Sequence, residues 1–170
     1  PMTAADAKYP EDDRLARDRA FMVARHLGAR GISDPQVLRA MGEVPREAFV
    51  SEPLAEFAYE DAPLPIEAGQ TISQPYIVAR MVELAELRPG DNVLEVGAGS
   101  GYAAAVMGRI ADKVYAIERH EELARLAQAR EAKLGYDNVE IICADGTKGW
   151  PEAAPFDAIM VSAGGPKIPE

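Results

Sequence analysis

The chain has 170 residues, and 18 Lys and Arg against 28 Asp and Glu give it a formal net charge of −10. Its length suits one domain rather than two full ones, and a composition of 48% hydrophobic and 27% charged residues excludes wholesale disorder. No apolar run exceeds residues 101–108, far short of the roughly 18 residues of a membrane span, so we expect a soluble protein with no membrane contact.

The first part of the chain is predicted to form two helices. Small and apolar residues recur at helical spacing over residues 12–27, and Gly28 marks an end. A second helix is expected after Asp34, because an aspartate is a favourable N-cap and Pro35 then occupies the first helical position. Pro45 ends this helix.

The next segment predicts little regular structure. Residues 51–70 contain three prolines and lack periodicity, so we expect an irregular connection with one short strand near residues 64–66. Apolar residues return at helical spacing over residues 75–87, and the Arg-Pro-Gly sequence that follows ends a third helix.

From residue 92 onward the pattern alternates between strand and helix. The expected strands are 92–96, 113–117, 139–144 and 156–161, and the expected helices are 102–111 and 121–134. This alternation implies right-handed crossovers and a parallel sheet, which is a doubly wound α/β fold. We expect a single domain over 1–170, with an N-terminal helical and irregular part (1–68) and a ligand-binding core (69–170).

The chain stops soon after the last expected strand, and no helix follows that strand. An uncovered edge strand is an aggregation hazard. We therefore expect either a truncated domain whose C-terminal strands are missing or a sheet edge that pairs with a partner.

A glycine-rich loop, VLEVGAGSGY, joins the first of these strands to its helix. Gly97, Gly99 and Gly101 let the backbone pass close to a ligand, and the helix start that follows favours an anionic group. The spacing differs from the dinucleotide fingerprint G-x-G-x-x-G, because Tyr102 stands where a small residue is needed. A nicotinamide-dependent oxidoreductase is therefore disfavoured.

Polar residues stand at the ends of all four predicted strands: Glu95, Glu118, Asp145 and Ser162. In open α/β sheets ligands bind beyond the carboxyl ends of the strands, so these side chains are expected to converge on one nucleoside. Glu118 suits the two hydroxyls of an unphosphorylated ribose, and Asp145 suits an exocyclic adenine amine. Glu95 suits a ligand with an ammonium and a sulfonium, or alternatively caps the glycine loop.

The segments VLEVGAGSGY, VYAIE, ADG and FDAIMVSAG resemble the motifs of class I S-adenosylmethionine-dependent methyltransferases. Upstream, GQTISQPYIVARM over residues 69–81 is similar to the signature of one family in this class, protein-L-isoaspartate O-methyltransferase. VLRAMGEVPREAFV over residues 37–50 agrees with the same family, and the resemblance covers residues 12–169. It implies a Rossmann-like methyltransferase sheet with N-terminal helices.

The resemblance also implies a reaction, its site and its partners. The methyl group of S-adenosylmethionine passes to the α-carboxylate of an L-isoaspartyl residue in a damaged peptide or protein, leaving S-adenosylhomocysteine, and the ester then closes to a succinimide. Ser73 matches the family's active-site serine, and Thr71, Ile72 and Gln74 line the same wall as substrate-binding residues. The expected cofactor-binding residues are Glu95, Gly97, Ala98, Gly99, Ser100, Gly101, Glu118, Asp145, Gly146 and Ser162.

This chemistry needs few catalytic groups. A free carboxyl titrates near pH ~4, so the substrate carboxylate is already ionised at pH ~7 and no general base is required. We expect Ser73 to orient that carboxylate through a hydrogen bond, although a serine at this place also suits a helix N-cap. His26 and His120 are expected at the surface.

Other interpretations of the sequence stay open at this stage. Another class I methyltransferase, or a truncated non-catalytic module that binds the cofactor, fits the same strand ends. No Cys/His cluster has metal-ligand spacing, and the scattered basic residues of an acidic chain disfavour nucleic-acid binding. The single Cys143 fits a reducing, cytoplasmic location and is expected as a small buried hydrophobe, while Trp150 either packs over an adenine or fills the core.

Overall fold

A parallel sheet lies at the centre of the molecule. The computed structural model describes residues 12–163. Its strands β3 (Asn92–Val96), β4 (Lys113–Glu118), β5 (Val139–Cys143) and β6 (Ala158–Val161) follow the order β5-β4-β3-β6 and are all parallel. The predicted strands are confirmed, except that the last begins at Ala158 rather than at residue 156. Because β3 lies inside the sheet with a partner on each side, its tip is the point where neighbouring loops meet.

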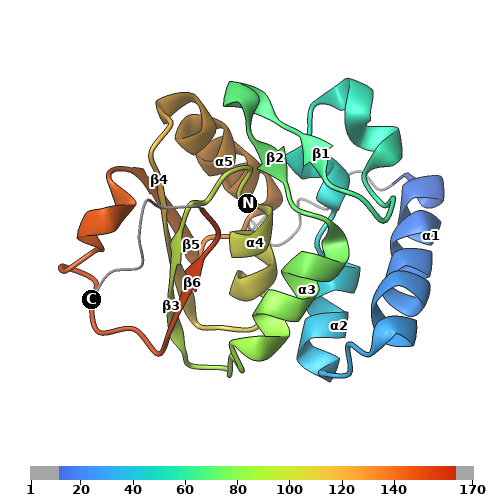
Figure 1. The fold of residues 1–170 in the computed structure, drawn as a ribbon, viewed down its shortest axis with the longest axis horizontal. Coiled ribbons are helices and arrows are strands. Elements are labelled where there is room, and N and C mark those ends of the chain that lie inside the picture. The colour runs from blue at the N-terminus through green and yellow to red at the C-terminus, as the bar shows by residue number, and fades with distance from the viewer. Residues whose placement is uncertain (1–11, 164–170) are drawn as a thin grey trace, which may run out of the picture.

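Helices cover one face of this sheet. α4 (Tyr102–Gly108) follows β3 and α5 (Glu121–Leu134) follows β4, and both pack against β4 and β5 (Figure 1). On the opposite face the Tyr115 ring packs edge-on against Trp150 at 5.2 Å between centroids and against Phe156 at 5.8 Å. Trp150 therefore fills space against the sheet and does not line the ligand cavity described below.

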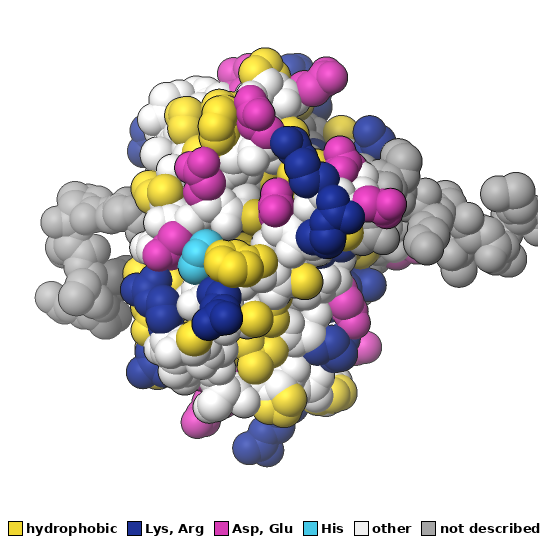
Figure 2. Space-filling view, turned by 90° about the vertical axis from the view of Figure 1, so that its right-hand side faces the viewer, with side chains coloured by type: hydrophobic (Ala, Val, Ile, Leu, Met, Phe, Trp, Pro, Cys, Tyr) yellow, Lys and Arg dark blue, Asp and Glu magenta, His cyan; other side chains and the backbone are white. Residues whose placement is uncertain are grey.

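The N-terminal helices lie outside α4 (Figure 1). α1 (Asp13–Phe21) continues directly as a π-helical stretch, η2 (Met22–Leu27), so the helix expected over residues 12–27 is confirmed, although its second half is π-helical rather than α-helical. α2 (Pro35–Glu43) is confirmed, and its N-cap Asp34 accepts a hydrogen bond from the Gln36 backbone N–H at 2.9 Å. Figure 2 shows basic and acidic side chains interspersed on this side of the molecule.

The connection to the sheet is irregular, as predicted. It consists of 3₁₀ turns at Arg46–Phe49 and Glu52–Phe57, a two-residue strand β1 (Leu64–Pro65), a third turn at Glu67–Gly69 and a second short strand β2 (Thr71–Ile72). β1 and β2 pair antiparallel, and α3 (Pro75–Leu84) follows directly. This hairpin (64–72) brings residues 70–73 to the carboxyl end of the sheet.

One hydrophobic core joins the N-terminal part to the sheet. Buried Met22, Leu27 and Val37 belong to the same cluster as Val106 and Val114. Phe49 meets the Tyr102 ring at the start of α4 with their centroids 5.7 Å apart. The N-terminal elements are thus packed onto the sheet's helical layer through apolar contacts, and burial of this kind is the main stabilising term in folding.

Residues on both outer strands of the sheet, β5 and β6, are more exposed than residues of a buried strand would be. Cys143 is exposed, so its prediction as a buried hydrophobe is wrong, because the end of the outer strand β5 leaves one side open. Ile159 and Val161 on β6 are 62% and 58% exposed. Over residues 12–163, none of the helices has both the length and the apolar character that crossing a membrane requires.

Candidate active site

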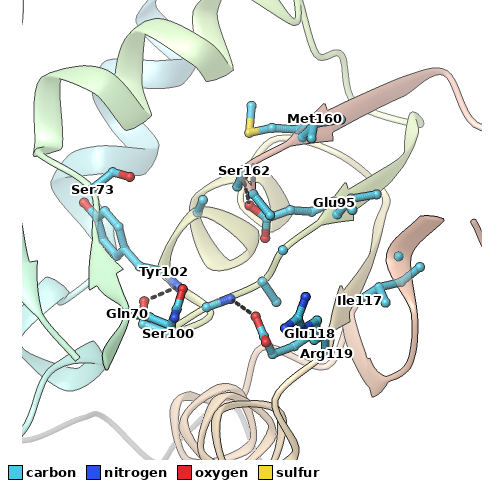
Figure 3. A pocket seen from close by; sticks show the side chains of 18 of the residues that line it. Gln70, Ser73, Glu95, Ser100, Tyr102, Ile117, Glu118, Arg119, Met160 and Ser162 are labelled. Carbon is cyan, nitrogen blue, oxygen red and sulfur yellow. Dashed lines mark hydrogen bonds between the residues drawn. The ribbon is translucent and has the colours of Figure 1, made fainter. Parts of the chain in front are cut away.

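A cavity of about 680 Å³ opens at the carboxyl ends of the strands. Five parts of the chain surround it: the β2 segment, the loop after β3, the tip of β4, the segment that follows β5 and the segment that follows β6 (Figure 3). Predicted site residues that line it are Thr71, Ile72, Ser73, Glu95, Gly97, Ala98, Gly99, Ser100, Glu118, Asp145, Gly146 and Ser162. The structure therefore brings together two groups of residues that were identified from separate motifs.

The glycine loop needs its glycines for backbone conformation and for space. Gly97, Gly99 and Gly101 have φ angles of 91°, 54° and 92°, in the left-handed region that other residues rarely adopt. A Cβ atom at Gly97 would also lie only 2.6 Å from the Cβ of Ala163. The Gly97 and Ala98 N–H groups both donate to the Ile117 carbonyl oxygen, at 2.8 and 3.0 Å, which ties the loop to β4.

Glu118 holds the loop from the tip of β4. Its buried carboxylate accepts from the Gly99 N–H at 2.9 Å through Oε1 and from the His120 N–H at 2.7 Å through Oε2 (Figure 3). The loop-capping role considered for Glu95 therefore belongs to Glu118. Each carboxylate oxygen has a second lone pair, so Glu118 can still accept from a pair of ligand hydroxyls.

Glu95 is fully buried beside the cavity. Its Oε2 accepts from the Ser162 hydroxyl at 2.7 Å, and its Oε1 is a buried oxygen with no hydrogen-bond partner in the part of the chain that the structure describes (Figure 3). Burial, with a smaller contribution from the Glu118 charge, raises the pKa of Glu95 to about 8. A buried acceptor without a partner is costly, so this oxygen suits a cationic ligand group that enters the cavity.

Asp145 stands at the third strand tip and is exposed. Its carboxylate accepts from the Thr147 N–H at 3.0 Å and from the Thr147 hydroxyl at 2.7 Å, and these hydrogen bonds lower its pKa below the usual range. Asp145 is therefore an anionic acceptor at neutral pH. At Gly146 a Cβ would lie 2.5 Å from Cγ1 of Val96, so only glycine lets this turn approach β3 so closely.

Ser73 lies across the cavity from Glu95 and Ser162 (Figure 3). Its side chain is exposed to the cavity, and it follows β2 directly. The alternative role of Ser73 as the N-cap of the next helix is wrong, because the N-cap of α3 is Gln74, which makes no side-chain capping hydrogen bond. The hydroxyl of Ser73 is thus available to a ligand.

Two predicted residues do not line the cavity. The Gln74 side-chain amide turns away and donates to Oδ1 of Asp61 at 2.6 Å. Gly101 serves as the N-cap of α4 in the left-handed conformation, behind the loop.

The cavity also contains residues that sequence reasoning missed. His120, expected at the surface, is half-buried in the wall after β4. Tyr102 and Met160 are buried wall residues, and Gln70 and Met81 come from the elements on either side of Ser73. The rule that ligands bind at strand tips would have found His120 and Met160, whereas Gln70 and Met81 depend on how the hairpin folds over the sheet.

The hairpin is anchored to the glycine loop by Arg130 of α5. Its guanidinium donates from Nη1 to the Ser100 carbonyl oxygen at 3.3 Å and from Nη2 to Glu67 Oε1 at 3.3 Å. One side chain therefore links the hairpin segment to the glycine loop, and its partly buried position limits the screening of this ion pair.

Comparison with known proteins shows that the chain is similar to members of one family. The family model described as Protein-L-isoaspartate(D-aspartate) O-methyltransferase matches residues 18–170. A protein-L-isoaspartate O-methyltransferase of Rhodopseudomonas palustris is 61% identical over 149 residues, which are 88% of this chain and 68% of that protein. One of Methylorubrum extorquens is 60% identical over 168 residues, which are 99% of this chain and 73% of that protein.

Solved structures give the same result. A protein-L-isoaspartate O-methyltransferase superposes with a TM-score of 0.79 at 36% identity, over 86% of this chain and 48% of that one. A structure from Plasmodium falciparum, described as a protein-L-isoaspartate O-methyltransferase in complex with S-adenosyl-L-homocysteine, has a TM-score of 0.73 at 26% identity, over 89% of this chain and 76% of that one. The chain thus spans about half of the first structure and about three quarters of the second.

Proposed function

The chain belongs to the protein-L-isoaspartate(D-aspartate) O-methyltransferase family, and we infer that it transfers the methyl group of S-adenosylmethionine to the α-carboxylate of L-isoaspartyl residues in damaged proteins. One observation carries this inference. A single cavity has Ser73 on one wall and the strand-tip carboxylates Glu95 and Glu118 on the other. The sulfonium of the cofactor supplies an electrophilic methyl group, and the cavity supplies a place where an acceptor can face it.

The strand-tip side chains form the cofactor half of the cavity. Glu118 would accept hydrogen bonds from the ribose hydroxyls, Asp145 would accept one from the adenine amine, and Oε1 of Glu95 would pair with a cationic group of the amino-acid part. The fit rests on that unpaired, buried oxygen of Glu95. Burial raises the pKa of Glu95 to about 8, and a cation at this oxygen would lower that pKa and favour the ionised carboxylate.

The β2 segment forms the acceptor half. An isoaspartyl carboxylate is ionised at neutral pH, so the chain only has to hold it in line with the methyl group and exclude water. Ser73 donates a hydrogen bond from its hydroxyl to one carboxylate oxygen and so orients the carboxylate, while Thr71 and Ile72 shape the wall beside it. Alignment of the two reactants can supply about 7–11 kcal/mol of the barrier, which explains how so few groups suffice.

A pair of peptides tests the function. The 170-residue chain is incubated with S-adenosylmethionine and either an isoaspartyl peptide or the same peptide with normal aspartate, and base-labile methyl ester is measured as released methanol. We expect ester on the isoaspartyl peptide only. Equal methylation of both peptides, or cofactor binding without any transfer, would contradict the proposal.

We also propose that residues 1–68 and 69–170 work as one domain. The shared core cluster and the contacts of α2 with α3 and α4 support this arrangement. The exposed, free thiol of Cys143 supports a reducing, cytoplasmic location.

The edge of the sheet at β6 is proposed to pair with a further strand. β6 is the last strand at one end of the described sheet, and Ile159 and Val161 present apolar surface there. An edge of this kind is a template for pairing. Light scattering should show self-association of the chain that Val161→Lys abolishes, and a monomer unaffected by that change would contradict pairing between copies.

A further inference from the structure

A buried arginine lies behind the acceptor wall. Arg46 begins the 3₁₀ turn Arg46–Phe49, has no exposed surface, and is not part of the cavity lining. Its Nε donates to the Ala58 carbonyl oxygen at 2.7 Å, and its Nη2 donates to the Ser73 carbonyl oxygen at 2.9 Å. Its guanidinium also lies over the Tyr102 ring, 4.9 Å from the centroid. Arg46 therefore contacts Ser73 and Tyr102, which both line the cavity, without lining the cavity itself.

The burial of this charge is expensive. Removing a guanidinium from water carries a large desolvation cost, and Nη1 has no hydrogen-bond partner within residues 12–163 to offset it. An apolar side chain of similar volume would avoid that cost. Unlike an apolar side chain, the planar guanidinium of Arg46 can donate to two carbonyl groups at fixed angles and contact an aromatic ring at the same time.

The residues that Arg46 holds are the ones whose relative position matters for methyl transfer. Ser73 is on the acceptor wall, and Tyr102 is the first residue of α4, directly after the glycine loop of the cofactor wall. Figure 3 shows the Ser73 and Tyr102 side chains next to each other at one side of the cavity. Because Tyr102 directly follows the glycine loop, a contact that holds Ser73 and Tyr102 together also fixes the acceptor wall relative to the cofactor wall.

The turn that carries Arg46 is itself held from behind. The Arg46 backbone N–H donates to the Tyr59 hydroxyl oxygen at 3.0 Å, and this hydroxyl donates to the Glu47 carboxylate. Arg19 of α1 donates to the same hydroxyl at 3.3 Å. The position of the guanidinium is thus determined by a buried polar network of the N-terminal part, which gives that part a role beyond covering α4.

We propose that Arg46 is a positioning residue for the transfer reaction: it fixes the Ser73 segment relative to the glycine loop, and so sets the alignment of acceptor and methyl donor. This inference rests on the proposed function. A displacement of about 1 Å between reacting groups can cost about 10²-fold in rate, so a loss of this anchor appears in turnover rather than in binding.

The first test is a double-mutant cycle. Arg46→Lys keeps the charge, but a single ammonium cannot reach both carbonyl oxygens and stack on Tyr102. We expect kcat to fall by about 10- to 100-fold, with KM for the isoaspartyl peptide and Kd for the cofactor changed by less than about 3-fold. In a Ser73→Ala background the same change should lower kcat by less than about 3-fold, because Arg46 acts through Ser73.

A second variant and a control separate positioning from general stability. Arg46→Met removes the buried charge together with its desolvation cost and is expected to fold and to repeat the kcat loss. Val37→Ala shortens a buried side chain of α2 and leaves a cavity among its apolar neighbours, so it should lower the melting temperature with little effect on kcat. The proposal is overturned if Arg46→Lys lowers kcat equally in the parent and in the Ser73→Ala background. It is also overturned if the kcat losses of both Arg46 variants merely follow their loss of melting temperature.

Hydrogen exchange gives a readout that does not depend on activity. Both Arg46 variants should speed amide exchange over residues 71–76 relative to the parent, and Val37→Ala should not do so selectively. If the parent methylates no isoaspartyl peptide but the variants loosen this segment, the proposed function fails and the anchoring role stands. If exchange over this segment is the same in parent and variants, Arg46 does not hold it and the inference fails.

Discussion

The two walls of the cavity are built in different ways. The cofactor wall consists of strand tips and a glycine loop whose shape is set by backbone hydrogen bonds between neighbouring strands, such as those from Gly97 and Ala98 to Ile117. The acceptor wall is a short hairpin and a residue without regular structure, held by side chains that come from distant parts of the chain. Arg46 and Arg130 reach it across 27 and 63 residues, respectively.

This difference has a consequence for how each wall responds to change. A backbone-built wall tolerates surface substitutions and fails when a glycine or a tip carboxylate is altered. A wall held by side chains can lose its alignment through a residue that never touches a ligand. Substitutions on the two walls should therefore differ in whether cofactor binding or turnover is lost.

The largest effect is expected on the acceptor wall, at Ser73. Ser73→Ala removes the hydroxyl that we propose orients the substrate carboxylate, so kcat should fall by a factor on the order of 10²–10³ with cofactor affinity nearly unchanged. Steady-state kinetics and calorimetry measure the two quantities. Ser51→Ala, at an exposed serine outside the cavity, is the matched control. An equal loss of turnover and cofactor affinity would show that the walls are not separable here.

The next effect is expected on the cofactor wall, at Glu118. Glu118→Gln leaves one acceptor where two backbone N–H groups donate, so the glycine loop loses a charge-assisted hydrogen bond. Cofactor affinity should fall by about 10- to 100-fold, consistent with about 1.5–3 kcal/mol for a hydrogen bond to a charged group. Glu152→Gln changes an exposed carboxylate and should leave calorimetric affinity as in the parent. Unaltered affinity of the Glu118 variant would remove this residue from the cofactor site.

A pH effect on stability is expected from the acids buried behind the cofactor wall. Burial raises the pKa of Glu131 to about 9 and that of Glu95 to about 8, both above the ordinary value of 4.5. The folded state therefore keeps protons that the unfolded chain releases, so this stability is complete below the unfolded pKa and is lost as pH rises toward the folded pKa. The free energy of unfolding should fall between pH ~5 and ~9.

Glu131→Gln should flatten that profile, because both carboxylate oxygens of Glu131 are buried without hydrogen-bond partners in the described part of the chain. At pH ~9 we expect the variant to be more stable than the parent by on the order of 1–2 kcal/mol in urea unfolding. Glu122→Gln, at an exposed site on the same helix, should keep the parent's pH dependence. A parent profile that rises over this range would contradict the assignment.

The smallest effect is expected at Asp61, which contacts the acceptor wall from the protein surface. Asp61 accepts from Gln74 at 2.6 Å and pairs with Arg30 at 3.1 Å, and this pair is solvent-exposed. Exposed pairs contribute about 0–1 kcal/mol, so Asp61→Ala should lower kcat by less than about 5-fold. A loss as large as that expected for Arg46→Lys would mean that the exposed and buried anchors are equally important.

The same contrast explains what could be predicted from the sequence. The strands, α5 and the strand-tip residues that line the cavity follow from short-range patterns: apolar runs, glycines between a strand and a helix, and acids at strand ends. The π-helical turn after α1, the pairing of β2 with β1, and the outward turn of Gln74 depend on contacts between distant residues. The same is true of Arg46, whose partners lie 12 and 27 residues further along the chain.

The two-walled cavity is tested most directly by a crystal structure of this chain with S-adenosylhomocysteine. From this arrangement we expect the ribose hydroxyls on Glu118, the adenine amine near Asp145, the amino group on Oε1 of Glu95, and the sulfur facing the Ser73 hydroxyl across open space. A ligand bound elsewhere, or one whose sulfur is separated from Ser73 by protein, would contradict it.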